Sequence, residues 1–313
     1  MTDKHGITPY RTVNCSGVER RLLHWNILDG GGSRIGSIIK FLTDGAYDIV
    51  TMNELNGYNA ASFARLGQRC GLPHTQLLAK SSYHLGVLSR HPIELIASER
   101  GHEFAHGLLC VRVIGLTLCV THLNPHDVTR RAMEAKIIVS RHAQAALDAE
   151  QPFMLVGDLN TLSPLDRGAH DDDDLTTKIR TGPYAEALSR KFLTKTRGEV
   201  DYNPMQLLLD APLLDVGAAA GYSVPTAVNA DKMHFSKLRL DYCLVSLAVI
   251  KATAAAGICR GSATRRSRRH RVRAALLRDE LTNTLSDHFP LEVAFQQMPH
   301  WTRSGGAGHV YER

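Results

Sequence analysis

The sequence has no apolar run of about 18 or more residues, which argues against a membrane-spanning helix. Its first residues, MTDKHGITPYRTVNCSGVE, are polar and do not form a secretory signal of the usual kind. No C-x-x-C pair occurs, and four of the six cysteines lie in or beside apolar runs. These absences predict an intracellular protein, cytoplasmic or nuclear, with reduced and buried thiols. The cysteines are Cys15, Cys70, Cys110, Cys119, Cys243 and Cys259.

Outside one segment, the chain has no excess of basic over acidic residues. Residues 260–278, RGSATRRSRRHRVRAALLR, contain eight arginines and no acid, and removing these eight charges from the net +6 leaves −2. So dense a run of like charge is typical of an extended, solvated segment. Three roles remain open for this arginine tract: a mobile loop without a specific role, an arm that binds phosphates, and a nuclear-targeting signal. The substrate-binding candidates in it are Arg265, Arg266, Arg268 and Arg269.

No internal repeat divides the 313 residues. This length allows two average domains, but a large two-sheet sandwich also reaches it as one domain. Strand and helix patterns interleave, which favours α/β layers within one domain. We expect a flexible leader over residues 1–20, one domain over 21–296 and a tail over 297–313. Surface excursions are expected at about 163–205, including the acidic run Asp171–Asp174, and at about 250–280.

Short apolar runs predict buried strands, and two stretches have helical spacing. One predicted helix contains Ile35, Ile38, Ile39 and Leu42, and the other spans 129–149. Residues 108–114 and 116–121 are predicted to form a hairpin around Gly115. The other predicted strands are 21–27, 48–52, 85–89, 152–156, 240–246 and 289–295.

Polar residues stand where the first of these strands end. Asn26 closes the first strand, Glu54 follows the second, and His122 follows the run 116–121. Strand ends on a rigid sheet are where a fold gathers functional side chains. Each residue taken alone is more often structural, as a turn Asn, a solvated Glu or a strand-end His. Together they offer ligands for a hard divalent metal and a donor to a phosphate.

Three further motifs lie later in the chain. Asp158 and Asn160 are two residues apart, so on extended backbone they share a face. Asp241 opens a strand, and the pair Asp287–His288 precedes the last one. Adjacent Asp and His side chains usually cannot pair with each other. We therefore expect the distant Asp241 to orient His288, as in a catalytic triad, and Asp287 to face the metal.

The order of these motifs resembles that of the endonuclease/exonuclease/phosphatase superfamily, which has the DNase I-like fold. The resemblance extends over residues 21–295 and also includes the strand LGVLSRHPI. The matching motifs are His24-Trp25-Asn26, Asn53-Glu54, Thr121-His122-Leu123, Gly157–Asn160, Asp241-Tyr242 and Ser286-Asp287-His288.

The resemblance implies a four-layered α/β sandwich, in which two mixed β-sheets pack face to face with helices outside and the active site at one rim. It also implies hydrolysis of phosphoesters with Mg²⁺, or Mn²⁺, by attack of an activated water on phosphorus. The implied metal residues are Asn26, Glu54 and Asp287. The implied catalytic residues are Asp158, which orients or deprotonates the water, Asn160 and His122, which contact the phosphate, and His288 with its partner Asp241.

The sequence also departs from several branches of this superfamily. Asn53 replaces the usual Gln before the metal Glu, and Tyr83 comes too early to match the Tyr of apurinic-site endonucleases. The cysteines suggest none of the structural disulfides of DNase I, and the lysine and arginine motifs of the inositol phosphatases are not found. The resemblance therefore identifies the superfamily and leaves the branch open.

We expect a monomeric, metal-dependent phosphodiesterase or nuclease that acts on nucleic acid, because the arginine tract favours a polyanionic substrate. A second hypothesis keeps the enzyme but changes the substrate to a small-molecule, inositol or lipid phosphoester. A third is a catalytically silent binding module of the same fold.

Overall fold

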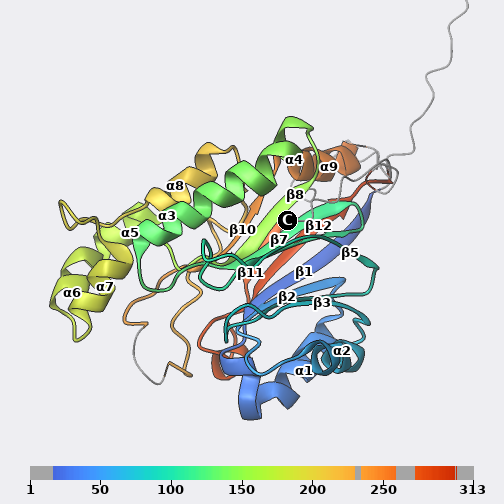
Figure 1. The fold of residues 1–313 in the computed structure, drawn as a ribbon, viewed down its shortest axis with the longest axis horizontal. Coiled ribbons are helices and arrows are strands. Elements are labelled where there is room, and N and C mark those ends of the chain that lie inside the picture. The colour runs from blue at the N-terminus through green and yellow to red at the C-terminus, as the bar shows by residue number, and fades with distance from the viewer. Residues whose placement is uncertain (1–16, 230–233, 259–271, 300, 302–313) are drawn as a thin grey trace, which may run out of the picture.

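Two six-stranded β-sheets pack face to face at the centre of the molecule (Figure 1). The computed structural model describes residues 17–229, 234–258, 272–299 and 301. One sheet has the order β11 (Arg273–Leu276), β12 (Leu291–Gln297), β1 (Val18–Asn26), β2 (Ile49–Asn53), β4 (Leu85–Ser89) and β3 (His74–Leu78). The other has the order β5 (Ile93–Glu99), β6 (Leu108–Val113), β7 (Leu116–His122), β8 (Phe153–Asp158), β10 (Asp241–Val245) and β9 (Leu214–Asp215).

Both sheets are mixed. The pairs β1–β2 and β7–β8 are parallel, and the remaining neighbours are antiparallel. Because the chain crosses over between the strands of each parallel pair, those two strands end at the same edge of their sheet. This topology brings sequence-distant strand ends to one rim.

Helices cover the outer faces of both sheets (Figure 1). The helices α1 (Ile35–Gly45) and α2 (Ala60–Arg69) lie outside the first sheet, and α3 (Val128–Ile137), α4 (Gln144–Asp148) and α8 (Asn203–Asp210) lie outside the second. The four-layered α/β sandwich expected from the motifs is therefore confirmed. The remaining helices are α5 (Arg167–Asp172), α6 (Leu175–Thr181), α7 (Ala185–Phe192) and α9 (Leu247–Ile258).

The core lies in three layers of apolar side chains. The central layer joins residues from both sheets, including Leu22 and Val87 from one and Val111 and Val156 from the other. The outer layers join each sheet to its helices. Because both faces of each sheet are covered, central strands such as β2 and β8 read as continuous apolar runs in the sequence.

The predicted helix over 129–149 is present and continuous from Val128 to Asp148, with a π-helical turn (Ile138–Ala143) between α3 and α4. The helix begins after Asp127, because the side chain of Asp127 accepts hydrogen bonds from the backbone N–H groups of Thr129 and Arg130. The hairpin around Gly115 is also present, as the turn between β6 and β7. The first strand begins at Val18, three residues earlier than predicted.

The excursion at 163–205 contains the helices α5, α6 and α7 and the start of α8. It has an apolar centre of its own, which includes Leu175, Ile179, Leu188 and Phe192. The second excursion, at about 250–280, contains the end of α9 and the edge strand β11. Its arginines Arg265, Arg266, Arg268 and Arg269 lie outside the described residues.

The expectation of reduced cysteines is wrong for one pair. Cys110 on β6 lies opposite Cys119 on β7, and the two form a disulfide. The hairpin register brings them together, although nine positions separate them in the sequence. Cys70 and Cys243 are free and buried, whereas Cys15 and Cys259 lie outside the described residues. Across the described ranges, no helix is both long enough and apolar enough to cross a membrane.

Candidate active site

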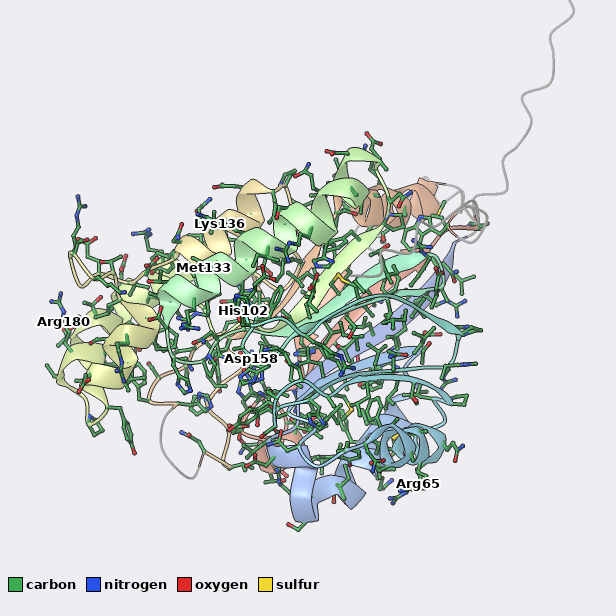
Figure 2. All side chains as sticks on the ribbon, in the orientation of Figure 1. Arg65, His102, Met133, Lys136, Asp158 and Arg180 are labelled. Carbon is green, nitrogen blue, oxygen red and sulfur yellow. A yellow bond between two sulfur atoms is a disulfide. The ribbon has the colours of Figure 1, made fainter. Side chains whose placement is uncertain are left out.

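The strand ends meet at one rim of the sandwich. In the first sheet, Asn26 at the end of β1 pairs in register with Asn53 at the end of β2. In the second sheet, Asp158 at the end of β8 lies between His122 on β7 and Asp241 on β10. Each parallel pair of strands thus brings the polar residues at its strand ends to the rim. The antiparallel strand β10 contributes its first residue, Asp241, to the same rim. Figure 2 shows Asp158 in the middle of the molecule, between the two sheets.

Two asparagines connect the sheets across this rim. The Asp158 backbone N–H donates to Oδ1 of Asn53 at 2.9 Å. Nδ2 of Asn26 donates to Glu54 Oε1 at 3.0 Å and to Asp158 Oδ2 at 3.3 Å. Carboxylates from different sheets therefore share one amide group. Asn53, the residue that departs from the superfamily's usual Gln, serves as the link between the sheets.

Two site residues have left-handed backbone. Glu54 has φ 59° and Asn160 has φ 49°, a region that costs energy for residues other than glycine. Asn160 is held there because its N–H donates to Asp158 Oδ1 at 2.9 Å and its Nδ2 donates to the Leu123 carbonyl at 3.2 Å. The surrounding bonds thus fix these conformations, as is common where side chains are aimed at a reacting centre.

Close packing between β7 and β8 requires glycine before Asp158. A Cβ on Gly157 would stand 2.0 Å from the Thr121 carbonyl oxygen, far inside van der Waals contact. Glycine therefore allows the His122 and Asp158 strand ends to approach. Nε2 of His122 lies 3.5 Å from Asp158 Oδ2 as a result.

His288 and Asp241 form the expected pair. Nδ1 of His288 lies 2.7 Å from Asp241 Oδ2, and its Nε2 lies 3.7 Å from Asp158 Oδ2. A third buried residue, His24, places Nε2 3.5 Å from the other oxygen of Asp241 and Nδ1 3.0 Å from Thr51 Oγ1. Asp241 is thus flanked by two imidazoles, and it fixes the orientation of His288.

The charges of this pair stabilise each other. Burial alone would lower the pKa of His288, but the charges of Asp241, Asp158 and Asp287 outweigh burial and raise this pKa to about 10. Burial would likewise raise the pKa of Asp241, and the His288 charge with hydrogen bonds from both imidazoles lowers it instead. His288 is therefore an imidazolium that can donate from Nε2.

Asp158 and His122 show the opposite behaviour. Burial raises the pKa of Asp158, against the opposing charge of His288, so this carboxylate binds a proton more readily than an exposed one. Burial, together with the His288 charge, lowers the pKa of His122 to about 3. His122 is therefore neutral at ordinary pH and can act as a hydrogen-bond donor without carrying charge.

The donor set fits a hard divalent cation. Burial raises the pKa of Glu54 to about 7, against its hydrogen bond from Asn26, and the Asp287 charge raises it further. The charge of His288 offsets this rise only in part, and a bound cation would supply further compensating charge. Asp287 Oδ2 lies 3.3 Å from His234 Nε2, and ligand atoms of His234, Asp287 and His288 lie within 4.8 Å of one another. Glu54 and Asp287 are the carboxylates that could hold the metal, and the group of ligand atoms around Asp287 is completed by His234 and His288.

The position of Asn26 differs from that of a simple metal ligand. Its Oδ1 accepts the Leu28 N–H at 3.1 Å, and its Nδ2 bridges two carboxylates. It orients Glu54 and Asp158 in this arrangement, and a ligand role remains a prediction. The sequence-predicted residues that the structure brings together are Asn26, Glu54, His122, Asp158, Asn160, Asp241, Asp287 and His288.

Sequence reasoning missed several neighbours. His24 shares its face of β1 with Asn26, two residues away, and this spacing was a usable signal. His234 and Lys191 come from irregular or excursion segments, where no pattern marked them. Tyr83, which was not assigned, lies with its ring centroid 6.2 Å from that of His122. The ring of His106 stands between them, 4.6 Å from His122 and 4.9 Å from Tyr83.

Comparisons with known proteins identify a similar sequence family and similar folds. Residues 23–288 match the sequence profile described as the Endonuclease/Exonuclease/phosphatase family. No curated protein sequence matches the chain significantly.

Solved structures share the fold at low sequence identity. An AP endonuclease from Archaeoglobus fulgidus superposes with a TM-score of 0.62 at 14% identity, covering 88% of this chain and 99% of that one. A 3'-5' exonuclease from Neisseria meningitidis gives 0.56 at 16% identity, with the same coverage of 88% and 99%. A truncated TDP2 from Caenorhabditis elegans gives 0.51 at 15% identity, covering 90% and 100%.

Proposed function

Because this chain belongs to the Endonuclease/Exonuclease/phosphatase family, we propose that it is a divalent-metal-dependent phosphodiesterase that cleaves nucleic acid. Solved structures that share its fold are named as an AP endonuclease and a 3'-5' exonuclease, and one is a 3' phosphatase bound to a product DNA hairpin. The proposed reaction is hydrolysis, in which water attacks phosphorus and the ester oxygen leaves.

One observation carries the proposal. The Asn26 amide nitrogen lies within hydrogen-bond distance of both Glu54 at 3.0 Å and Asp158 at 3.3 Å. A metal-holding carboxylate and a water-activating carboxylate are thereby fixed next to each other on rigid strand ends. This arrangement would let Asp158 activate a water next to a phosphate held at the site.

Glu54 and Asp287 would hold Mg²⁺ or Mn²⁺, with Asn26 orienting Glu54. When bound, the metal supplies positive charge to the phosphoryl oxygens. Asp158, whose pKa is raised by burial, accepts a proton from the attacking water. His288, kept protonated by Asp241, donates from Nε2 to a phosphoryl oxygen and stabilises its developing charge.

Two further groups hold the phosphate and its surroundings. His122 is neutral and donates one hydrogen bond to a phosphoryl oxygen. Asn160 keeps the Leu123 carbonyl in place through its Nδ2, and so fixes the loop that follows His122. Asn160 also offers its remaining amide oxygen to the water.

Turnover on a panel of substrates tests this function. Plasmid DNA, single-stranded RNA, inositol phosphates and lipid phosphoesters are incubated with Mg²⁺ and with EDTA. We expect cleavage of nucleic acid with Mg²⁺ and none with EDTA. Glu54→Gln and His288→Ala should each lower kcat by at least about 100-fold. Glu94→Gln, on an exposed part of β5, is the matched control and should keep full activity.

Two results would refute the proposal. Turnover that persists in EDTA would remove the metal from the mechanism. Full activity in both site variants would remove these residues from it. Cleavage restricted to inositol or lipid phosphoesters would keep the mechanism and replace the substrate.

A further inference from the structure

A basic helix pair stands beside the active site. Residues 175–198, which contain α6, α7 and the following turn, carry six basic residues and one acidic residue. Figure 2 shows Arg180 at the far end of this pair, on the opposite side of the molecule from Arg65 of α2. Buried apolar residues, among them Ile179 and Leu188, hold the two helices together, so the charged side chains other than Lys191 are exposed.

A groove of about 420 Å³ separates this helix pair from the start of α3. Three cations line it, and its one acid, Asp127, is occupied as the N-cap of α3. Arg190 and Lys195 are exposed. Arg190 forms an ion pair with Glu186 at 3.7 Å, but both groups are solvated and such a pair is weak. The Arg190 guanidinium is therefore available to bind a phosphate. Residues that line the groove include Asp127, Val128, Arg180, Arg190, Thr194 and Lys195.

A buried arginine connects this groove to the active site. Arg131 of α3 is fully buried and donates from Nη1 to the Asn124 carbonyl at 2.7 Å and from Nη2 to the Lys191 carbonyl. Asn124 lies two residues after His122, so Arg131 fixes the end of α7 against the loop that follows the catalytic strand. Glu134 secures the same loop by accepting the Asn124 N–H at 2.8 Å.

Lys191 lies at this fixed point, at the end of α7. Its Nζ lies 5.2 Å from the centroid of the Phe192 ring. Burial lowers the pKa of Lys191 to about 8, and the charges of Asp158, Asp287 and Glu54 act against burial. The negative charges of the site thus act on the Lys191 ammonium group, whose backbone Arg131 ties to the loop after His122.

His126 lies in the loop between β7 and α3 and is affected by the charges of the helix pair. Burial lowers the pKa of His126, and the nearby charges of Lys191, Arg190 and Arg131 lower it further. This imidazole lies four residues after His122 in the chain, so the charges of the helix pair act on the loop that follows the catalytic strand.

We propose that the basic helix pair binds the phosphodiester backbone of a nucleic acid, with Lys191 on the phosphate at the site and Arg190, Lys195 and Arg180 on the flanking phosphates. The inference rests on the proposed function and names the surface that holds its substrate. Lys178 is excluded from the set because it pairs with Asp173. Cations arranged on successive phosphates release counterions, so affinity should fall as salt rises.

Binding of the full-length protein to a fluorescein-labelled single-stranded oligodeoxynucleotide, in EDTA and at several salt concentrations, tests this surface. The variant Arg190→Gln/Lys195→Gln removes two exposed charges, and Arg65→Gln/Arg69→Gln removes two from α2 as a matched control. Each phosphate contact contributes about 0.7 to the slope of log affinity against log salt for single strands. We expect the first variant to lose about 1.4 from this slope and about 25-fold in affinity at 0.1 M salt. The control should bind like the wild type.

Lys191 is tested separately with Mg²⁺ present. Lys191→Gln should lower kcat/KM on the oligonucleotide at least about 10-fold, and Lys191→Arg should recover part of the loss, which a purely structural role would not predict. Equal affinity and salt slope in the groove and control variants would overturn the inference, even if the enzyme hydrolyses bis(4-nitrophenyl) phosphate. Charge-dependent binding through the groove without hydrolysis of any phosphodiester would support the surface and refute the proposed function.

Discussion

Arg239 tests how the excursion at 163–205 is held to the catalytic strand. It is buried, two residues before Asp241, and donates to Asp166 Oδ2 at 2.8 and 3.0 Å and to Asp215 Oδ2 at 2.6 Å. Its guanidinium also lies 4.5 Å from the centroid of the Tyr242 ring. Replacing Arg239 with Met keeps most of the packing and leaves two carboxylates without their counter-charge.

The expected cost of Arg239→Met is about 3–5 kcal/mol in the free energy of unfolding, because breaking a buried pair leaves uncompensated charge. Most of this loss in the free energy of unfolding should come from Asp215, because its side chain is 0% exposed, whereas that of Asp166 is 18% exposed. Adding Asp215→Asn to the Met variant should therefore recover about 1–2 kcal/mol. Urea denaturation of the single and double variants measures both values.

Arg273→Met is the control. Arg273 pairs with Glu19 at 3.5 Å, and their side chains are 61% and 52% exposed, so its loss should cost less than about 1 kcal/mol. A cost for Arg239→Met no larger than that of the control would refute the reasoning. So would further destabilisation when Asp215→Asn is added.

Three more predictions concern the rim. In EDTA, the folded state keeps Glu54 protonated up to about pH 7, whereas the ordinary pKa of this group is 4.5. The free energy of unfolding should therefore fall, by roughly 3 kcal/mol at most, as the pH rises from 4.5 to 7. Urea titrations at several pH values should show this fall in the wild type and not in Glu54→Gln. Gly157→Ala should lower both stability and activity, because its Cβ would meet the Thr121 carbonyl oxygen, and a variant as stable and active as the wild type in melting and turnover assays would contradict this. Asp241→Asn should lower kcat by about 10²–10⁴ with little change in KM, because His288 loses the charge that keeps it protonated and oriented; unchanged steady-state kinetics would contradict the pairing.

The sequence motifs predicted most of the residues that meet at the rim, whereas hydrophobic periodicity predicted only some of the strands of the two sheets. Asp158 and His288 end or precede continuous apolar runs that both reach the rim, so their convergence followed from topology. The edge strands β3 and β5 were missed because their residues are partly exposed and lack a continuous apolar pattern. The pairing of Cys110 with Cys119 depends on hairpin register, which single residues do not encode.

The unpredicted site residues come from segments without periodicity. Lys191 lies at the end of α7, within an excursion that seemed only polar and solvated. Its backbone is held by Arg131, a buried cation that charge counting treats as an ordinary surface residue. Tertiary contacts of this kind are set by the packed structure and not by spacing along the chain.

The central claim is that water, activated at Asp158, attacks phosphorus. Hydrolysis of a nucleic acid phosphodiester in ¹⁸O-labelled water with Mg²⁺, followed by mass spectrometry of both products, tests it most directly. The account predicts that one labelled oxygen enters the product phosphate and none enters the product alcohol. Label in the alcohol would show cleavage of the carbon–oxygen bond and would contradict the mechanism.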